Sequence, residues 1–326
     1  MANLQTKYMN LELKNPIIVG SSGLTNSVDS IKELANNGAA AVVLKSLFEE
    51  QIMMEIDKSM KYYPPAHSHT ETEDYLSYFE KKHHLEKYLN LIKDTKKTVD
   101  IPIIASINCR TASEWINFAE EIEKAGADGL ELNIFLLPSD FKQGIDGKLY
   151  FEIIKKIRAK IKIPIAVKIG YYFNNLAQHI VQLSRTDING LVLFNRTYNP
   201  DIDIEKEELV ASEPLSCEHE IAHSIRWLGI VSPHTDCSLA ATGGIHNAES
   251  VLKEIFVGAD AVQIVSVLYK KSATEIKRIL ENLETWLDKK QYDSIQKFKG
   301  KLARTEISNP QFYERVQFMK YLQGEA

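Results

Sequence analysis

Residues 239–271, LAATGGIHNAESVLKEIFVGADAVQIVSVLYKK, constrain the fold of this chain more than any other stretch. Residues 239–242 and 261–265 are short apolar runs with the length and composition of buried strands. Residues 248–257, which lie between them, carry apolar side chains at helical spacing. Two parallel strands joined by a crossover helix belong to a sheet that helices cover on both faces. The stretch therefore predicts one unit of an α/β fold.

Local signals mark both ends of the helix at residues 248–257. Asn247 stands in the capping position, and Gly258 follows the helix, where a left-handed conformation costs a glycine little. Because Ser250 occupies the third helical position in place of Glu or Gln, we expect a simple cap without the full reciprocal capping box. Gly243 and Gly244 follow the first strand, and such a pair leaves backbone N–H groups free to bind a phosphate.

The same unit repeats along the chain. The segments KAGADGLELN, VGADAVQIV and NNGAAAVVL each end a helix with glycine and begin a strand at once. The expected strands are residues 16–20, 40–44, 101–107, 128–134, 163–169, 190–194, 239–242 and 261–265. The expected helices are residues 27–37, 85–97, 112–124, 149–160, 176–186, 218–228, 248–257 and 273–289. This alternation predicts an α/β fold of the (β/α)8 TIM barrel type, with residues 1–326 in a single domain. A doubly wound sheet with a second domain is the alternative, although no change in composition marks a domain boundary.

Three segments lie outside this repeat. Residues 4–14 predict an N-terminal cap hairpin, and the charged tail that ends at Ala326 predicts a C-terminal helical extension. Residues 47–84 fit no regular period, so we expect an irregular excursion that serves as a lid, an interface or a substrate loop. Within it His67, His69, Glu71 and Glu73 alternate and would share one face of an extended strand. A solvated loop is the more common outcome for such a run, and we expect no metal site.

Composition excludes several classes of protein. The 326 residues carry a formal net charge of −5 with scattered Lys and Arg, which argues against a nucleic-acid surface. No apolar run approaches the roughly 20 residues that a membrane-spanning helix needs, and the N-terminus lacks the pattern of a signal peptide. The three cysteines are far apart, which argues against a disulfide framework, an iron–sulfur cluster or a Cys-type zinc site. We therefore expect a cytoplasmic globular protein.

Polar residues gather at the expected carboxyl ends of the strands, where the active sites of TIM barrels lie. These residues are Ser21, Ser22, Lys45, Ser46, Asn108, Asn133, Lys168, Asn195, Gly243 and Gly244. A lysine that ends a buried strand points into the barrel mouth or pairs with an acid there, so Lys45 and Lys168 favour an anionic or heteroaromatic ligand. A flavin fits these groups. Its phosphate would bind at Gly243, Gly244 and the backbone near Ser266, and Lys168 would lie against the N1–C2=O edge, where positive charge stabilises the reduced form.

The order of these motifs resembles the soluble class 1 dihydroorotate dehydrogenases along nearly the whole chain. LKNPIIVGSSGLT is similar to that family's first strand and flavin-binding loop. VVLKS, GADGLELNI, IPIAVKI, FNRTYNP and AATGGI match its later strand ends, and QYDSIQKFKGKLA resembles its C-terminal segment. The resemblance implies oxidation of the small molecule dihydroorotate to orotate in pyrimidine biosynthesis, with FMN as cofactor, and a homodimer. It implies FMN contacts from Ser22, Gly23, Lys45, Ser46, Asn133, Lys168, Asn195, Gly243, Gly244 and Ser266. Lys45 and Asn133 are expected to have catalytic roles as well.

Departures from the family concern the substrate side of the site. The family's catalytic base is a cysteine or serine shortly after the strand-four asparagine, and that position falls on Leu136, which cannot accept a proton. We expect Ser139 to substitute in a remodelled loop. Residues 47–84 lack an NxxGLPN-like motif, and the glycine pair expected after strand six is replaced around residues 212–216. Val265-Ser266 stands where the eighth strand of the family usually ends in Gly-Thr. The flavin side thus matches the family better than the substrate side.

Two other hypotheses stay open from the residues alone. A flavin paralogue could act on a different, dihydropyrimidine-like substrate. A phosphate-binding barrel enzyme without a flavin, such as a phosphosugar isomerase, could use Glu131 and Lys168 as acid and base. The spacing of the cysteines does not exclude an iron–sulfur cluster on a partner subunit.

Overall fold

A computed structural model of the chain describes residues 2–50, 52, 54, 70–109, 112–137, 139, 147–196 and 199–314. Its centre is a closed barrel of parallel strands. The barrel strands are β3 (Ile17–Val19), β4 (Ala41–Val43), β6 (Ile103–Asn108), β7 (Gly129–Ile134), β8 (Ile165–Ile169), β9 (Gly190–Leu193), β12 (Ser238–Thr242) and β13 (Ala261–Ile264). They follow one another in the order β4-β3-β13-β12-β9-β8-β7-β6, and a pairing of β4 with β6 closes the ring. The predicted (β/α)8 barrel is therefore confirmed, and the doubly wound alternative is wrong.

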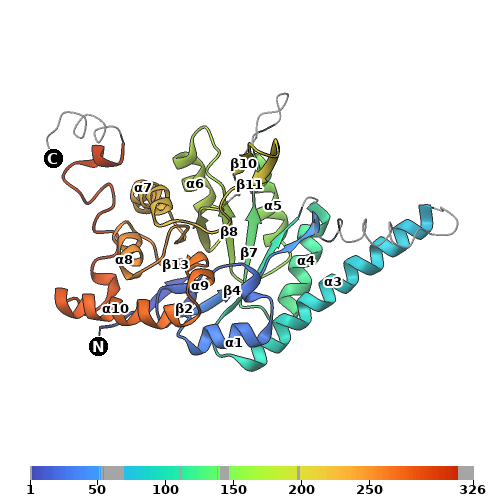
Figure 1. Cartoon of the computed structure of the whole chain (residues 1–326), viewed down its shortest axis with the longest axis horizontal. Coiled ribbons are helices and arrows are strands. Elements are labelled where there is room, and N and C mark those ends of the chain that lie inside the picture. Colours follow the sequence, from blue (N-terminus) through green and yellow to red (C-terminus); the bar gives the residue numbers. More distant parts are fainter. Residues whose placement is uncertain are drawn as a thin grey trace.

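Helices surround the barrel, and each barrel strand is followed along the chain by one of them (Figure 1). They are α1 (Val28–Asn36), α3 (Thr70–Thr98), α4 (Ala112–Lys124), α5 (Lys148–Arg158), α6 (Leu176–Ser184), α7 (Ile221–Val231), α8 (Ala248–Phe256) and α10 (Thr274–Lys290). Shorter elements are α9 (Ser266–Lys270) and the 3-10 turns η1 (Gly23–Thr25), η2 (Glu218–Glu220) and η3 (Ser232–His234). A two-residue strand, β5 (Leu47–Phe48), pairs with the end of β6.

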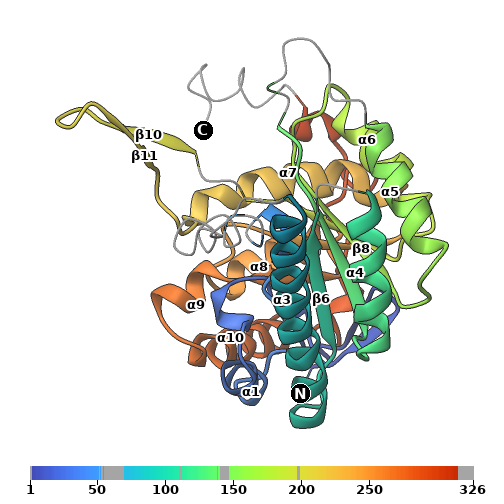
Figure 2. The same ribbon diagram turned by 90° about the vertical axis from the view of Figure 1, so that its right-hand side faces the viewer.

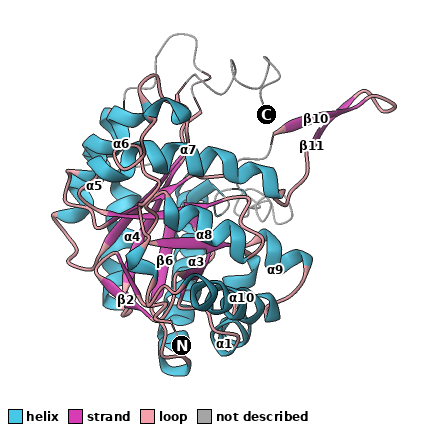
Figure 3. Cartoon of the chain, turned by 90° about the vertical axis from the view of Figure 1, so that its left-hand side faces the viewer, coloured by secondary structure: helices cyan, strands magenta, loops and turns pink. Residues whose placement is uncertain are grey.

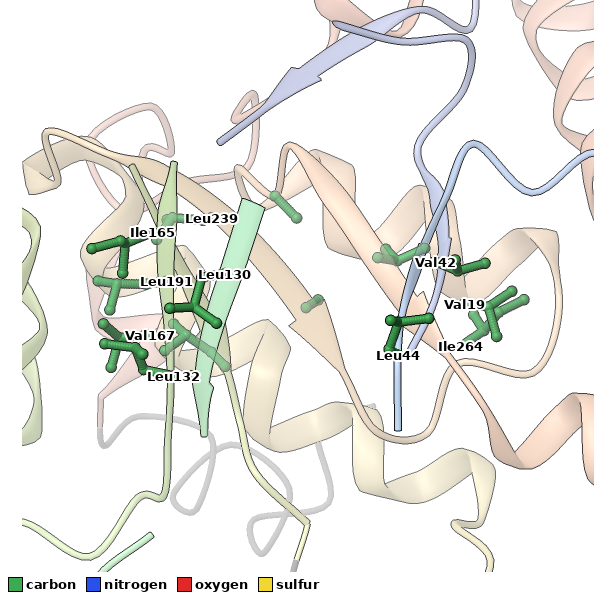
Figure 4. Packing of buried hydrophobic residues seen from close by; sticks show 14 of the residues in the cluster. Val19, Val42, Leu44, Leu130, Leu132, Ile165, Val167, Leu191, Leu239 and Ile264 are labelled. Atoms are coloured by element: carbon green, nitrogen blue, oxygen red, sulfur yellow. The ribbon is translucent and has the colours of Figure 1, made fainter. Parts of the chain in front are cut away.

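The main core lies between the strands and the helices. Side chains alternate along each strand, so every second residue points outward to the helix layer. These outward residues are almost all Val, Leu or Ile, as Figure 4 shows for Val19, Val42, Leu130, Val167 and Ile264. All of them are buried. A parallel sheet that is covered in this way explains why the strands read as continuous apolar runs in the sequence.

The predicted N-terminal hairpin closes the bottom of the barrel. It consists of β1 (Thr6–Tyr8) and β2 (Leu11–Leu13), joined by Met9 and Asn10, which both have positive φ as a tight two-residue hairpin turn requires. Tyr8 and Met9 pack with inward residues of the strands. The members of this second core are Tyr8, Met9, Leu13, Ile18, Ala40, Ala41, Val43, Ile104, Ala166, Val192, Ala240 and Ala261. A Cβ on Gly129 would lie 3.0 Å from the Met9 side chain, so small residues line the lumen where the hairpin fills it.

A second hairpin was not predicted. Strands β10 (Pro200–Asp203) and β11 (Glu208–Ala211) pair only with each other and project away from the barrel (Figures 2 and 3). They lie in the connection between β9 and α7, which the sequence presented only as a gap between a strand and a helix.

The expectation of an irregular segment at residues 47–84 is partly wrong. Helix α3 already begins at Thr70, some way before the predicted start at residue 85. Residues 70–84 lack an apolar face of helical period, but they include three Glu and two Lys, which favour helix intrinsically. The first half of α3 extends beyond the barrel, as Figure 1 shows. The premise of an extended strand at Glu71 and Glu73 is therefore wrong, and His67 and His69 lie outside the described residues.

The prediction of a helical C-terminal tail is also wrong for the part described. Residues 291–314 contain turns and bends, an isolated β-bridge from Ser294 to Asn3, and the 3-10 segments η4 (Ile295–Lys297) and η5 (Pro310–Tyr313), but no α-helix. Their backbone N–H groups bond to other elements: Gly300 N donates to Ile255 O at 2.9 Å, and Leu302 N donates to Phe256 O at 2.9 Å. The tail follows the end of α8 because these contacts replace the hydrogen bonds of a helix.

Helix α8 begins with a complete capping box, contrary to the expectation from Ser250. The Asn247 side chain accepts from Ser250 N at 2.9 Å, and Ser250 Oγ accepts from Asn247 N at 3.0 Å. The serine side chain is shorter than that of Glu or Gln, but the first turn of the helix brings its hydroxyl close enough to accept the same hydrogen bond. Gly258 ends the segment with φ of +108°, as predicted.

Helices in the described part of the chain include none that is long and apolar enough to cross a membrane. No group of three or more His, Cys, Asp or Glu residues in the same part is placed to hold a metal ion.

A buried carboxyl joins α7 to α8. Glu254 of α8 is fully buried, and its Oε1 accepts a hydrogen bond from the Ser224 hydroxyl of α7, while Oε2 has no partner in the described part. Burial raises the pKa of Glu254 to about 8, and the Ser224 hydrogen bond only partly opposes this shift. The folded pKa exceeds the ordinary value of 4.5, so the stabilisation is complete below pH 4.5 and is lost as the pH rises to about 8.

Glu254→Gln should therefore remove a pH-dependent loss of stability. Between pH 5 and pH 8.5 the wild type should lose roughly 2–4 kcal/mol of unfolding free energy relative to the variant. Urea unfolding at both pH values measures this difference. Glu249→Gln, an exposed change on the same helix, should keep the wild-type profile. Parallel profiles for Glu254→Gln and the wild type would show that the buried carboxyl does not titrate as described.

Candidate active site

A pocket of about 540 Å³ opens at the carboxyl ends of the barrel strands. Every residue predicted to contact a cofactor lines it: Ser22, Gly23, Lys45, Ser46, Asn133, Lys168, Asn195, Gly243, Gly244 and Ser266. The wall further includes Ser21, Phe48, Arg196, Pro214, Leu215, Ser216, Thr242, Ile245, Gln263, Ile264, Val265 and Tyr269. Its size is within the range of pockets that hold small ligands and cofactors.

The charged side chains that line this pocket are all positive in the described part of the chain. Lys45, Lys168 and Arg196 line it, and no Asp or Glu does so in the part of the chain that the structure describes. Lys45 follows β4, and Lys168 lies within β8, so the barrel itself directs both toward the mouth. Such a lining favours an anionic ligand.

Hydroxyl and amide groups form a continuous hydrogen-bonded row along one side of the pocket. Ser46 Oγ lies 3.1 Å from Ser21 Oγ and 2.7 Å from Ser106 Oγ. Asn133 Nδ2 donates to Ser46 Oγ at 3.5 Å, and Asn195 Nδ2 donates to Asn133 Oδ1 at 2.5 Å. The row fixes the orientation of both asparagine amides, which then present defined donors and acceptors to a ligand.

Helix α3 supports this row from outside the barrel. The buried Tyr88 hydroxyl accepts a hydrogen bond from Ser106 N at 2.8 Å and donates to Ser106 O at 3.1 Å. The tyrosine thus satisfies backbone groups of β6 where the row begins. The side chain lies in the half of α3 that the sequence predicted correctly as helix.

Beneath the mouth, a second row crosses the lumen of the barrel. Lys168 Nζ donates to Gln263 Oε1 at 3.3 Å, and Gln263 Nε2 donates to Glu131 Oε2 at 2.6 Å. Gln263 and Glu131 are each 1% exposed, and Lys168 is 9% exposed. Gln263 was not predicted as a site residue, although a glutamine inside an otherwise apolar strand is a detectable signal in the sequence.

The glycine loop after β12 has the geometry of a close backbone approach. Gly243 and Gly244 have φ of +94° and +71°. A Cβ on Gly244 would lie 2.3 Å from the backbone nitrogen of Ile221, the first residue of α7. Only glycine permits this contact, which brings the start of α7 next to the loop.

Ser266 and its neighbours form the other side of the same corner. Ser266 Oγ accepts from Ser216 N at 2.9 Å, and Ser216 Oγ lies 3.1 Å from His246 Nε2. Lys270 Nζ donates to Ser216 O at 2.8 Å. Burial, and secondly the Lys270 charge, lower the pKa of His246, which favours a neutral imidazole at this bond.

Arg196 fixes the connection that follows β9. Its guanidinium donates from Nε to Glu220 Oε2 at 2.9 Å and to the Pro214 and Glu213 carbonyls at 2.8 and 3.0 Å. Burial of Glu220 opposes its ionisation, but hydrogen bonds from Arg196 and Cys217 lower the pKa of this carboxyl below its usual value. Arg196 was not predicted as a site residue, although it stands directly after Asn195 in FNRTYNP.

The residues expected on the proton-transfer side are not brought into the pocket wall. Ser139 is exposed and does not line the pocket, and Leu136 is half-buried against the core. Phe135 packs edge-on against Tyr172, and Tyr172 lies beside Tyr171, which stacks on His223. Aromatic rings thus occupy the region after β7 and β8.

Comparison with known proteins agrees with this arrangement. A family model described as dihydroorotate dehydrogenase matches residues 74–287. The chain is similar to a dihydroorotate dehydrogenase B (NAD(+)), catalytic subunit, from Thermoplasma volcanium, with 26% identity over 313 residues, 92% of this chain and 98% of that protein. A protein of the same name from Thermoplasma acidophilum is 24% identical over 93% of this chain and 100% of its own length. One from Methanocaldococcus jannaschii is 23% identical over 87% of this chain and 93% of its own length. Since the family model covers most of a chain that forms the expected barrel, this protein belongs to the dihydroorotate dehydrogenase family.

Proposed function

We propose that residues 1–326 form a single FMN-binding barrel that oxidises dihydroorotate to orotate in pyrimidine biosynthesis. The observation that carries this proposal is the pocket at the barrel mouth, which is lined by three cationic side chains and by all the residues that the family resemblance assigned to FMN. Membership in the family and the names of the relatives support the same reaction.

The donor set of the pocket fits FMN. Gly243, Gly244 and Ser266 meet at one corner, where backbone N–H groups suit a phosphate. Lys168 reaches the pocket from the lumen and would offer positive charge to the ring system. The row from Ser46 to Asn133 and Asn195 offers fixed amide groups to the carbonyl and imide edge of a flavin or of a pyrimidine.

Oxidation of dihydroorotate removes one hydride and one proton from adjacent carbon atoms. Bound FMN supplies the acceptor of the hydride. Lys45 and Asn133 would bind and orient the anionic substrate against the cofactor, as their places on the pocket wall support. The proton needs an acceptor from the chain, and Ser139 is the hydroxyl in the described residues that directly follow β7. Because Ser139 does not line the pocket, this role would require the segment after β7 to bring the hydroxyl to the bound substrate. Residues 47–84, which begin with β5 and end within α3, would supply the lid, interface or substrate loop.

We further propose a homodimer, to which the β10–β11 hairpin contributes. Cross-strand pairs Ile202–Leu209 and Pro200–Ala211 place apolar side chains on one face, and Asp203–Glu208 lies on the other. Ile202 is 62% exposed and Leu209 is 78% exposed. An isolated two-stranded ribbon is marginally stable in water. Pairing of the apolar faces of two copies would cover them and leave the acidic faces in solvent.

A cytoplasmic location is proposed as well. The three cysteines, Cys109, Cys217 and Cys237, are all free in the structure, which suits a reducing compartment.

The first prediction concerns the reaction. Purified protein should be yellow with bound FMN, and anaerobic addition of dihydroorotate should bleach the flavin absorbance. NAD should restore the colour if it accepts the electrons, as the names of the relatives suggest for those proteins. A protein that stays colourless when FMN is supplied would refute the cofactor. Flavin that bleaches with dithionite or NADH but not with dihydroorotate would refute the substrate.

The second prediction concerns the base. Ser139→Ala should slow flavin reduction by dihydroorotate about 100-fold or more, because the transferred proton loses its acceptor. The dissociation constant of FMN should not change, since Ser139 does not line the pocket. Stopped-flow spectroscopy measures the rate, and Ser308→Ala, in the C-terminal tail, is the control. An unchanged rate in Ser139→Ala would assign proton transfer to another group.

The third prediction concerns assembly. Light scattering should give the wild type about twice the monomer mass of 37.0 kDa. Ile202→Lys combined with Leu209→Lys should shift the protein to monomer, because two charges would lie in the apolar contact. Asp201→Lys, on the opposite face of the ribbon, should leave the dimer intact. A wild type that is monomeric, or a double variant that stays dimeric, would contradict this use of the hairpin.

A further inference from the structure

The row that crosses the barrel lumen connects a sealed carboxyl group to the pocket. It runs from Glu131 on β7 through Gln263 on β13 to Lys168 on β8. The three side chains come from strands that are not all neighbours in the ring, so the row spans the inside of the barrel. Only Lys168 and Gln263 reach the pocket wall, and Glu131 lies below it.

The hydrogen bonds determine the direction of this row. A lysine ammonium group can only donate, so the Gln263 carbonyl oxygen must face Lys168. The Gln263 NH2 group then faces Glu131 and donates to Oε2 at 2.6 Å. Oε1 of Glu131 has no partner in the described part of the chain. The carboxylate is therefore held through Gln263 alone, as an acceptor.

We propose that Glu131 and Gln263 are positioning residues for the cofactor, which act on it through Lys168. Gln263 holds the lysine ammonium in place beneath the ring system, and Glu131 contributes a buried negative charge that moderates the positive potential there. The inference rests on the proposed FMN site. A charge inside the barrel is poorly screened by water, so its effect extends over the short distance to the pocket.

Loss of the Glu131 charge and loss of the Gln263 contact to Lys168 should change the electrostatic potential at the flavin in opposite directions, so the two roles can be tested separately. Glu131→Gln removes the negative charge but keeps an acceptor for Gln263, so the potential at the flavin should become more positive. Gln263→Leu removes the acceptor that holds the Lys168 ammonium beneath the pocket, so the positive charge is no longer fixed there and the potential should become less positive. A purely structural role would weaken the site in both variants.

Sulfite binding to FMN-loaded protein measures this potential without turnover. Sulfite adds to oxidised flavin and leaves negative charge at the N1–C2=O edge, so nearby positive charge tightens its binding. We expect the sulfite dissociation constant to fall about tenfold in Glu131→Gln and to rise about tenfold in Gln263→Leu. Glu254→Gln is the matched control, because Glu254 is also a fully buried glutamate but lies between α7 and α8. It should leave the constant unchanged.

Each outcome decides the inference. The inference would be overturned if sulfite bound more weakly to Glu131→Gln than to the wild type, or if the sulfite dissociation constant shifted in the same direction in Glu131→Gln and Gln263→Leu. Wild-type dissociation constants in both variants, or an equal shift in Glu254→Gln, would also overturn it. If a variant does not fold, Glu131→Met or Gln263→Met replaces it, and the sulfite dissociation constant should change in the same direction as for the original variant. If the wild type binds no FMN, the proposed function fails. If it binds FMN and sulfite normally while the variants do not respond, only this inference fails.

Discussion

Closure of the parallel sheet is the constraint on which the other features depend. Once β4 pairs with β6 and β3 pairs with β13, alternate side chains of every strand must point either into the lumen or toward the helices. All carboxyl ends of the strands then meet at one mouth. Residues that are distant in sequence, such as Lys45 and Gly243, become parts of one pocket wall because of this geometry.

The side chains that fill the barrel lumen change from apolar to polar along the barrel axis. At the bottom, Tyr8 and Met9 of the N-terminal hairpin fill the space left by alanines and glycines of the strands. Above that apolar layer lie Glu131, Gln263 and Lys168, and the pocket opens above them. Buried polar groups are expensive unless they are hydrogen-bonded, so a layer of this kind is expected where a site requires it.

The two sides of the barrel mouth differ in structure. Ser46, Asn133, Asn195 and Lys168 are tied into hydrogen-bonded rows, and the Gly244 loop packs directly on α7. After β7 and β8 the chain presents aromatic rings and Leu136, where the family resemblance led us to expect a protonatable group. The same scaffold can therefore keep one cofactor while the loops that follow the strands adjust the chemistry, as is common for this fold.

Much of this protein was determined by the sequence alone. The glycine-ended helices and apolar strands specified the barrel, its order of elements and the polar strand ends, because hydrophobic period and capping are local signals. The rows from Lys168 to Glu131 and from Asn195 to Ser46 were decided only by the closed sheet, since they join residues far apart in the chain. Contacts of the tail with α8 likewise decided that the tail is not helical. The early start of α3 lies in residues whose apolar side chains show no helical period, so it could not be predicted from the sequence pattern. Local patterns specify elements, but the partners of buried polar groups depend on which strands become neighbours.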